Sequence, residues 1–302
     1  MDRLESMSTL VAAVQAGSLS AAARKLGMPL ATVSRKVSEL EAHLHTRLLN
    51  RSSRKLSLTD AGRSYLAACT RILEEIEEAE RAATGEYSLP KGELVITAPI
   101  VFGRLHVLPV VTEFLRAYPE IDIRLMFSDR VTNLVEEDVD IAVRVGTLPD
   151  SSLVALRVGA IQRCICGSPS YFAQRGTPKH PEDLSGHDCV TFSGMSSVDA
   201  WAFKGKWHST TVAVHSRLVV STAEAAIDAV VAGVGITQLF SYQIAAAEAT
   251  GQLVRVLRAF ESEPVPVHLL HEGQALLPLK LRAFLDFAAP RVKARLPALH
   301  SL

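Results

Sequence analysis

Hydrophobic side chains near the amino terminus recur at three- and four-residue steps, which is the spacing of an amphipathic helix. The first such run has its apolar positions within residues 4–14, and Gly17 ends the predicted helix. The second covers residues 19–26 and lies between Ser18, a residue type favoured at helix N-caps, and Gly27, which supplies a turn. The pattern therefore predicts two short helices joined by a tight turn, with a third helical run after them.

The third run extends from Pro29, which suits the first turn of a helix, to Leu44. Its inward positions are Val33, Val37, Leu40 and Leu44. Its outward and flanking positions carry hydroxyls and cations, which reach base edges and phosphates. The residues after it predict a small β-hairpin with a basic tip. Helix, turn, helix and basic hairpin in this order indicate a winged helix-turn-helix that binds double-stranded operator DNA. The expected DNA contacts are Ser20, Leu30, Ala31, Thr32, Ser34, Arg35, Lys36, Arg51 and Arg54.

Residues 59–87 contain no proline and place apolar residues at alternating steps of three and four. This is the a/d pattern of a helix that pairs with a second copy in a coiled coil. A dimer is expected because a DNA site read by a helix-turn-helix normally calls for two copies. The alternative is a single amphipathic helix that packs on its own domain. The residues of this seam are Tyr65, Cys69, Ile72, Ile76, Ala79 and Ala83.

Beyond a linker at residues 88–92, strand-like and helix-like runs alternate, which predicts an α/β domain with largely parallel sheets. The middle of this region has strands of its own, so we expect two lobes, with the chain crossing between them near residue 160 and near residue 265. The cations after Pro290 predict a loosely held tail. The expected strands are 93–98, 121–127, 139–145, 234–239 and 265–271, and the expected helices are 102–117, 131–137, 222–232, 242–249 and 279–289.

Ligands of open α/β sheets bind at the carboxyl ends of strands, facing helix N-termini. The segment 97–103 combines a strand end, backbone N–H groups that open a helix, and apolar side chains. A helix N-terminus favours an anion, so we expect a small-molecule effector such as a carboxylate or an aromatic metabolite. The expected effector-binding residues are Thr97, Pro99, Ile100, Val101, Phe102, Gly146, Phe192, Trp201, Ser221 and Gln238.

Composition and charge narrow the classes of function. No apolar run approaches the roughly 18 residues of a membrane span, and the first residues lack the pattern of a signal peptide. The net charge is zero, yet residues 1–64 hold ten Lys/Arg against five Asp/Glu, a balance typical of a DNA-binding module. The four cysteines and the scattered histidines lack zinc-site spacing. We therefore expect no metal and no cofactor, and a cytoplasmic setting.

The motifs of the chain resemble those of the LysR-type transcriptional regulators over its whole length. In the amino-terminal module the matching segments are 17–27 (GSLSAAARKLG), 33–35 (VSR), 40–41 (LE), Leu44, 47–49 (RLL), Arg51 and 58–62 (LTDAG). In the remainder they are 140–146 (DIAVRVG), 168–171 (SPSY) and 232–236 (AGVGI).

This resemblance implies a regulator that binds operator DNA and senses a small organic effector. It implies an all-α winged helix-turn-helix domain, a long linker helix that forms a homodimer, and a two-lobed α/β effector domain similar to periplasmic binding proteins. Association of dimers into a homotetramer is also expected. The predicted boundaries are 1–58 for the DNA-binding domain, 59–88 for the linker helix and 89–302 for the effector domain, with lobe I at about 92–160 and 266–302 and lobe II at about 161–265.

One position departs from the family pattern. Residues 29–32 are Pro-Leu-Ala-Thr, where the family usually has Ser-Gln-Pro-Ala, so Leu30 takes the place of a glutamine that often reads bases. Leu30 cannot donate a hydrogen bond but can contact a thymine methyl group. We therefore expect general DNA affinity to persist and the preferred half-site to differ from the family consensus.

Other functions compete with effector sensing. The alternative within the regulator class is a carboxy-terminal domain that senses thiol oxidation or serves only for assembly. Cys164 and Cys166 share one face of a strand and Cys189 is a third thiol, but their apolar neighbours favour buried, inert groups. An enzyme is not expected, because the chain has no Gly-x-Ser-x-Gly, phosphate-loop or His-Glu-x-x-His motif.

Overall fold

The computed structural model describes residues 2–50, 56–83, 89–130, 134, 137–149, 151–192, 200–204, 209–273 and 277–296. The chain forms two compact units, Met1–Leu89 and Pro90–Leu302, each with its own hydrophobic core. Among the described residues, no helix combines the length and the apolar character needed to cross a membrane.

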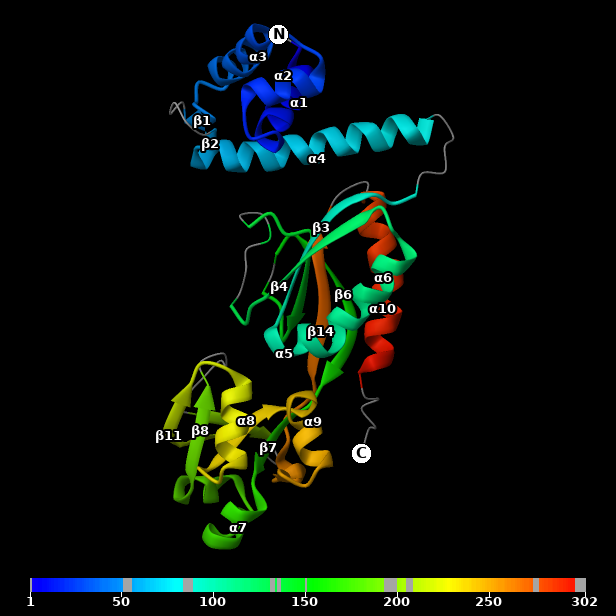
Figure 1. Cartoon of the computed structure of the whole chain (residues 1–302). Helices are drawn as coiled ribbons and strands as arrows, with labels where there is room; N and C mark the ends of the chain where they lie inside the picture. The colour runs from blue at the N-terminus through cyan, green and yellow to red at the C-terminus, as the bar shows by residue number, and fades with distance from the viewer. Residues whose placement is uncertain are drawn as a thin grey trace. The chain divides into compact units, whose positions relative to one another are not determined.

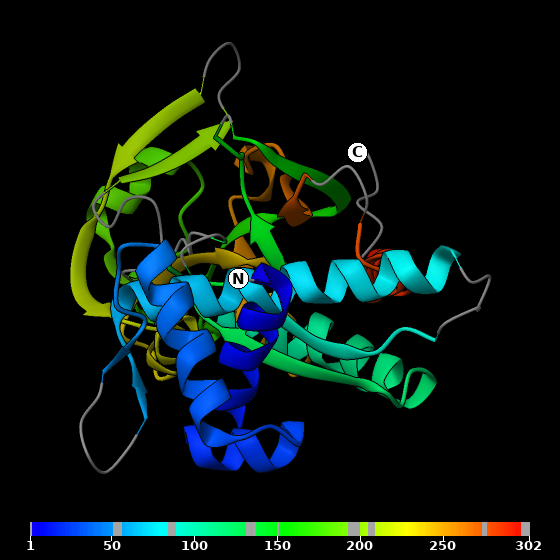
Figure 2. The same cartoon turned by 90° about the horizontal axis from the view of Figure 1, so that it is seen from above.

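The first unit begins with α1 (Arg3–Gln15), α2 (Leu19–Leu26) and α3 (Leu30–His43), which pack against one another as Figure 2 shows. The predicted capping of α2 is confirmed. The Ser18 hydroxyl accepts the Ala21 N–H at 3.1 Å, and Gly27 ends the helix with φ +64°, a left-handed conformation that glycine adopts without steric cost. The sequence pattern therefore located this helix-turn-helix correctly.

The predicted hairpin consists of β1 (Leu49–Asn50) and β2 (Ser57–Leu58), which pair in antiparallel register. It leads directly into α4 (Asp60–Ala83). Gly62 lies where α4 meets β1, and a Cβ atom at this position would overlap the backbone carbonyl of Leu48. The close approach of helix and hairpin therefore requires glycine here.

The two halves of the α4 seam have different surroundings. Tyr65 packs against the core of the first unit, and Cys69 is fully buried. Ile72, one turn further along, is 40% exposed. The first turns of α4 therefore pack on their own domain, whereas the later seam residues Ile72 and Ala79 are exposed.

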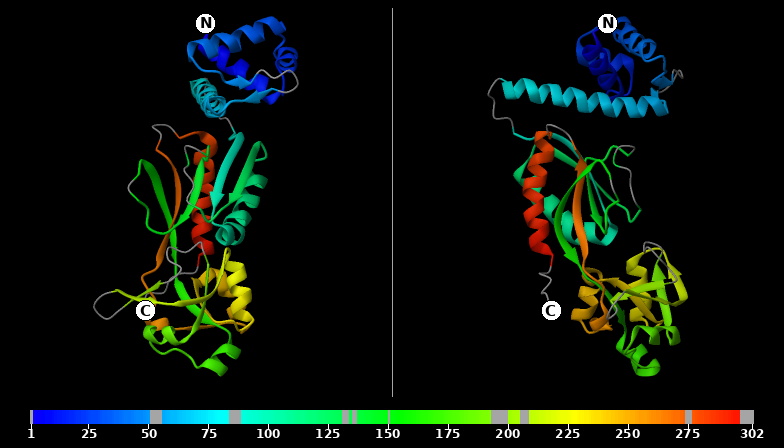
Figure 3. Two further views of the ribbon diagram at one scale, coloured as in Figure 1. Left: turned by 90° about the vertical axis from the view of Figure 1, so that its left-hand side faces the viewer. Right: turned by 180° about the vertical axis from the view of Figure 1, so that it is seen from behind.

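Lobe I of the second unit contains a five-stranded sheet in the order β4-β3-β5-β14-β6. Figures 1 and 3 show α6 and α10 side by side on one face of this sheet, and the two helices pack on each other. The elements are β3 (Gly92–Ala98), α5 (Ile100–Phe102), a π-helical turn (Gly103–Val107), α6 (Leu108–Ala117), β4 (Ile121–Phe127), β5 (Ile141–Val145), β6 (Leu153–Ile161), β14 (Val265–Glu272) and α10 (Leu279–Arg295).

Lobe II contains a second five-stranded sheet, in the order β11-β8-β12-β7-β13, and a separate hairpin formed by β9 and β10. Its strands are β7 (Arg163–Gly167), β8 (Asp188–Phe192), β9 (Ala200–Lys204), β10 (Ser209–Ala213), β11 (His215–Val220), β12 (Ile236–Phe240) and β13 (Val254–Val256). Its helices are α7 (Pro169–Arg175), α8 (Ala223–Val231) and α9 (Ser241–Ala249), with 3₁₀ turns at Pro181–Gly186 and Arg258–Phe260.

The expectation of largely parallel sheets is wrong. In each sheet two strand pairings are parallel and two are antiparallel. The physical reason is the double crossing of the chain. Strand β6 leaves lobe I and β14 returns to it, so these two neighbours run in opposite directions. Helix–strand alternation alone predicts parallel neighbours and does not reveal a returning strand.

The expected loose tail after Pro290 is also contradicted. Helix α10 continues through Pro290 to Arg295, and Val292 is buried. Leu296 packs so closely on Gly159 of β6 that a Cβ atom there would lie 2.5 Å from the leucine Cδ1. Burial of these two side chains offsets the cost of proline in a helix. The predicted helix at 131–137 falls mostly outside the described residues.

Candidate functional site

One face of α3 is buried and the opposite face is open to solvent. Val33, Val37 and Leu40 are buried against α1 and α2, as the periodicity predicted. Leu30 is 50% exposed at the first position of the helix. Ser20, Ala31 and Arg35 are also exposed, whereas Thr32 and Ser34 are half-buried on the flanks.

Arg35 is held only loosely in this structure. Its Nη1 lies 2.7 Å from Glu39 Oε1, one helical turn away, and its side chain is 65% exposed. Exposed pairs of this spacing contribute only about 0.3–0.5 kcal/mol. A phosphate or a base edge can therefore replace Glu39 at little cost.

Lys36, which was expected to face outward or along the flanks of α3, lies on a flank and turns toward α1. The Lys36 ammonium forms an ion pair with Glu5 of α1, and only 12% of its side chain is exposed. Position 36 lies three residues after Val33 and four before Leu40, and this spacing places it beside the buried stripe. Lys36 therefore connects α3 to α1 instead of reaching away from them.

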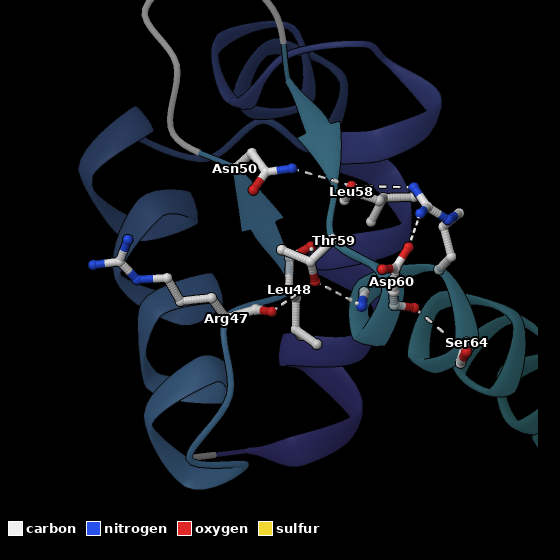
Figure 4. Close-up of polar contacts among 9 residues, drawn as sticks. Arg47, Leu48, Asn50, Leu58, Thr59, Asp60 and Ser64 are labelled. Atoms are coloured by element: carbon white, nitrogen blue, oxygen red, sulfur yellow. Dashed lines mark hydrogen bonds and ion pairs between the residues drawn. The ribbon is translucent and has the colours of Figure 1, made fainter.

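Two polar residues that the sequence analysis did not single out fix the hairpin. Glu41 Oε1 accepts the N–H groups of Leu48 and Leu49 at 2.8 and 3.0 Å. The Thr59 hydroxyl donates to the Arg47 carbonyl at 2.7 Å and accepts the Gly62 N–H at 2.9 Å (Figure 4). Both residues occur in the motifs quoted above, and the structure supplies their physical role.

The exposed Arg47 was also missed as a possible DNA contact. Its side chain extends away from the hairpin in Figure 4, and its backbone carbonyl is fixed by Thr59. The two hairpin arginines that were predicted, Arg51 and Arg54, lie outside the described residues.

The second unit contains a cavity of about 640 Å³ where the carboxyl ends of strands from both lobes meet. Its walls come from the segment after β4, the end of β5, the start of β7, the ends of β8 and β12, the start of α9 and the approach to β14. The lining residues are Pro99, Ser128, Asp129, Arg130, Arg144, Val145, Gly146, Thr147, Arg163, Phe192, Gln238, Leu239, Phe240, Tyr242, Gln243, Glu263, Pro264, Val265 and Pro266.

Four of the ten predicted effector contacts line this cavity: Pro99, Gly146, Phe192 and Gln238. The other six do not. Three belong to the apolar core, because Val101 and Phe102 turn inward from α5 and Trp201 of β9 is buried in the core of lobe II. Thr97 is buried inside the lobe I sheet, Ile100 is half-buried at the start of α5, and Ser221 is exposed before α8.

At the predicted anion site, the helix opened by residues 97–103, one N–H group already has an acceptor from within the chain. Asp129 Oδ1 accepts the Ile100 N–H at 3.1 Å, so a carboxylate of the protein already occupies this helix N-terminus. The helix itself, α5, is only three residues long before the π-helical turn begins. Another feature must therefore supply any anion preference of the cavity.

Two arginines of the cavity wall are partly withdrawn from water. Burial lowers the pKa of Arg144 and of Arg163 from the usual arginine value. Arg144 Nη1 donates to the Val143 carbonyl at 3.3 Å, while its Nη2 is buried and finds no acceptor within the described part of the chain. The Arg163 guanidinium lies over the Phe240 ring, 5.1 Å from the ring centroid. Sequence reasoning missed both residues, although Arg144 lies inside the quoted 140–146 motif.

An aromatic cluster continues from Phe240. Its ring stacks on Tyr242 with centroids 6.0 Å apart and an interplanar angle of 12°. Tyr242 in turn meets Phe102 and His106 of lobe I edge-on, at 5.4 and 5.5 Å. Burial raises the pKa of Tyr242 and lowers that of His106, so both groups are neutral near pH 7. The cavity wall is thereby joined to the contact between the lobes.

All four cysteines are reduced and buried. Burial raises the pKa of Cys164 and of Cys189 to about 12, far above the range of reactive thiols. No cluster of three or more metal-ligating side chains occurs in the residues that the structure describes.

Comparison with known proteins places both units in one family. The family model of the LysR substrate binding domain matches residues 88–293. The model of the bacterial regulatory helix-turn-helix protein, lysR family, matches residues 4–63.

Individual relatives match over nearly the whole length. An HTH-type transcriptional repressor of Pseudomonas aeruginosa (strain UCBPP-PA14) is 36% identical over 289 residues, which cover 95% of this chain and 91% of that protein. The solved structure of CrgA, a LysR-type transcriptional regulator from Neisseria meningitidis, is 32% identical with a TM-score of 0.61, covering 95% and 98% of the two chains. The full-length structure of AphB, a Vibrio cholerae virulence activator, is 29% identical with a TM-score of 0.60, covering 94% and 98%.

Proposed function

Because this chain belongs to the LysR family of transcriptional regulators, we propose that it binds operator DNA through the exposed face of α3 and senses a small organic effector in the cavity. The assignment of residues 1–58 to DNA binding, 59–88 to the linker helix and 89–302 to effector sensing is part of this proposal, as is a cytoplasmic setting.

The observation that carries the DNA-binding half is the division of α3 into a buried and an exposed face. The exposed side presents Leu30, Ala31 and Arg35, with Thr32 and Ser34 on its flanks. Hydroxyls and guanidinium groups bind phosphates and base edges, and small apolar groups contact thymine methyls. Ser20 at the start of α2, with Arg51 and Arg54 of the hairpin, extends the proposed contact surface to the DNA backbone.

The cavity supports the sensing half because its walls come from both lobes. In the part of the chain that the structure describes, the lobes are joined at Gln162 and near Pro264, and Gln162 Nε2 donates to the Ser262 carbonyl at 2.8 Å. A ligand that contacts both walls changes the preferred angle between the lobes. To regulate transcription, the ligand must bind with different affinities to the assembly that can bind the operator and to the assembly that cannot.

A homodimer formed through α4 completes this mechanism. Ile72 is exposed in the single chain and continues the seam that begins at Tyr65 and Cys69. A second α4 would cover this side chain, and a pair of heads would read two half-sites of an operator. We include the association of dimers into a homotetramer as an expectation of the same proposal.

The sensing half is tested on the full chain with metabolites made or consumed by the products of the flanking genes. A cognate effector raises the midpoint of thermal unfolding by mass action and changes the DNA footprint. If these metabolites neither stabilise the protein nor alter the footprint, the sensing half is refuted. The relatives are named transcriptional regulators, and we propose that the second unit turns over no substrate, which a turnover screen with the same metabolites checks.

A further inference from the structure

The acidic groups around the cavity have partners within the chain, whereas a nitrogen of one arginine does not. Its two acids already have partners: Asp129 accepts the Ile100 N–H at 3.1 Å, and Glu263 Oε1 lies 3.1 Å from Lys204 Nζ. Arg130, Arg144 and Arg163 also line the cavity. Three arginines against two acids give the cavity lining a positive balance, which favours an anion.

Arg144 has N–H groups that make no hydrogen bond within the described part of the chain. Its Nη2 is buried without an acceptor among the described side chains and backbone groups. A buried guanidinium N–H of this kind is costly to leave without a hydrogen bond, and a ligand that supplies an acceptor removes the cost. A planar fork of donors also matches the geometry of a carboxylate, which can accept two parallel bonds.

Arg163 reaches the same cavity from lobe II, where it opens β7. Its guanidinium covers Phe240, and Phe240 stacks on Tyr242. Phe192 at the end of β8 adds a third aromatic side chain to the wall. Flat side chains that stack on one another offer a surface on which a planar ligand can stack in the same way.

From this arrangement we infer that the effector is a planar organic acid, of the class of aromatic or arylacrylic carboxylates. Its carboxylate binds between Arg144 of lobe I and Arg163 of lobe II, and its ring lies against Phe240 and Tyr242. The inference rests on the proposed sensing function. It locates the anion at the two arginines and not at the helix N-terminus of residues 97–103, where Asp129 already binds.

Charge and size separate this class from the other candidates. A cationic ligand would face three arginines against two acids, one of which is paired with Lys204, and like charges repel strongly in a partly desolvated site. A neutral aromatic ligand would stack but bring no negative charge to the two guanidinium groups. A volume of about 640 Å³ lies within the ordinary range for small-molecule sites and accommodates a one- or two-ring acid.

The test uses the full chain with named probes at millimolar concentration: benzoate, 4-hydroxybenzoate, cinnamate and 1-naphthoate. Methyl benzoate serves as a neutral probe and benzamidine as a cationic one. We expect at least one acid to raise the thermal midpoint in proportion to the logarithm of its concentration, and the ester and the amidine to leave it unchanged. This comparison needs no variant and is independent of any effect of mutation on folding.

Variants then locate the carboxylate. Arg144→Ala and Arg163→Ala should each weaken binding of the active acid by about tenfold to a hundredfold, as expected for the loss of charge-assisted hydrogen bonds. Arg163→Lys keeps the charge and should recover only part of the loss, because lysine cannot make the paired contact. Arg116→Ala, which removes an exposed arginine of α6 away from the cavity lining, should bind like the parent.

The outcomes separate this inference from the function on which it rests. Equal stabilisation by ester and acid, binding unaffected by both alanine variants, or no shift with any acid of the panel would overturn the assignment of the effector class. A metabolite of another class that stabilises the same protein would overturn it while leaving the sensing function intact. Loss of sensing itself would appear as no response to any metabolite of the flanking genes.

Discussion

Most of the residues proposed to bind DNA lie on one helix, α3, whereas the cavity takes its walls from segments spread between residues 99 and 266. In the first unit, a three- and four-residue period separates the buried face of α3 from the exposed one. In the second unit, the residues that meet at the cavity follow no period, because strand ends bring them together. A local site can thus be located from its own sequence, while an assembled site requires the topology.

The first way to test this contrast is to disturb the joint between α4 and the hairpin. Gly62→Ala places a methyl group against the Leu48 carbonyl, which is backbone and cannot rotate away. Alanine normally favours a helix by about 1 kcal/mol over glycine, but overpacking costs about 1–3 kcal/mol. We expect net destabilisation of the first unit and weaker DNA binding, measured by denaturant unfolding and gel shift.

Gly186→Ala is the matched control for this change, since a Cβ atom at position 186 meets nothing within 4 Å. It should alter the free energy of unfolding by less than about 0.5 kcal/mol. Equal stability of both variants would contradict the described joint.

The second test removes one cation from the exposed face. Arg35→Ala should weaken DNA binding by roughly tenfold if the side chain contacts a base, and it should reduce the salt slope by ~0.9 if it contacts a phosphate. Arg116→Ala, which makes the same charge change in the second unit, should leave both quantities unaltered. Affinities measured over a range of salt concentrations distinguish the cases, and an Arg35→Ala protein identical to the parent would remove this residue from the interface. Arg51→Ala is likewise expected to weaken DNA binding and to reduce the salt slope by ~0.9.

The third test addresses base reading by the exposed Leu30. Replacing individual thymines of a selected site by deoxyuridine removes one methyl group each. At a contacted position this should weaken binding about fourfold, from ~0.8 kcal/mol per buried carbon. In the Leu30→Ala variant the same replacement should have no effect. Sensitivity that persists unchanged in the variant would assign the contact to another residue.

The smallest expected effect concerns the thiols of the second unit. With a pKa of about 12, on the order of one in ten thousand molecules carries a Cys164 or Cys189 thiolate at pH 8. The thiolate fraction, and with it alkylation of the native protein, should increase as pH rises toward 12 and stay negligible below pH 9. Replacement of Cys164, Cys166 and Cys189 by Ser should leave DNA binding unchanged after mild oxidant treatment. Fast alkylation at pH 8, or an oxidant response lost in the variant, would support thiol sensing.

Features of the first unit that depend on neighbouring residues could be predicted from the sequence, whereas a contact between distant residues could not. Ser18, Gly27 and the buried stripe of α3 are local features, and each was predicted correctly. The pair formed by Lys36 and Glu5 was missed because it joins two helices 31 positions apart. The position of Lys36 beside the stripe hinted at it, but the choice of partner depends on how α1 packs.

The second unit shows the same limit more strongly. Periodicity gave the ranges of β3, β4, β5, β12 and β14 and of the helices α6, α8, α9 and α10. It gave no range for α7, and it revealed neither the antiparallel return of β14 nor the burial of Leu296. The hydrogen bond from the Ile100 N–H to Asp129 was not predicted, since a capping residue 29 positions away carries no local signal. Arg144 and Arg163 became candidates only when the strand ends were seen to meet.

Selection of genomic DNA fragments by the purified full-length chain at low ionic strength tests the central claim most directly. If the exposed face of α3 reads DNA, the parent and Arg116→Ala reproducibly enrich specific fragments, and Arg35→Ala enriches them less. If the parent enriches no fragment over bulk DNA, or if Arg35→Ala selects the same fragments with equal affinity, the exposed face of α3 does not read DNA.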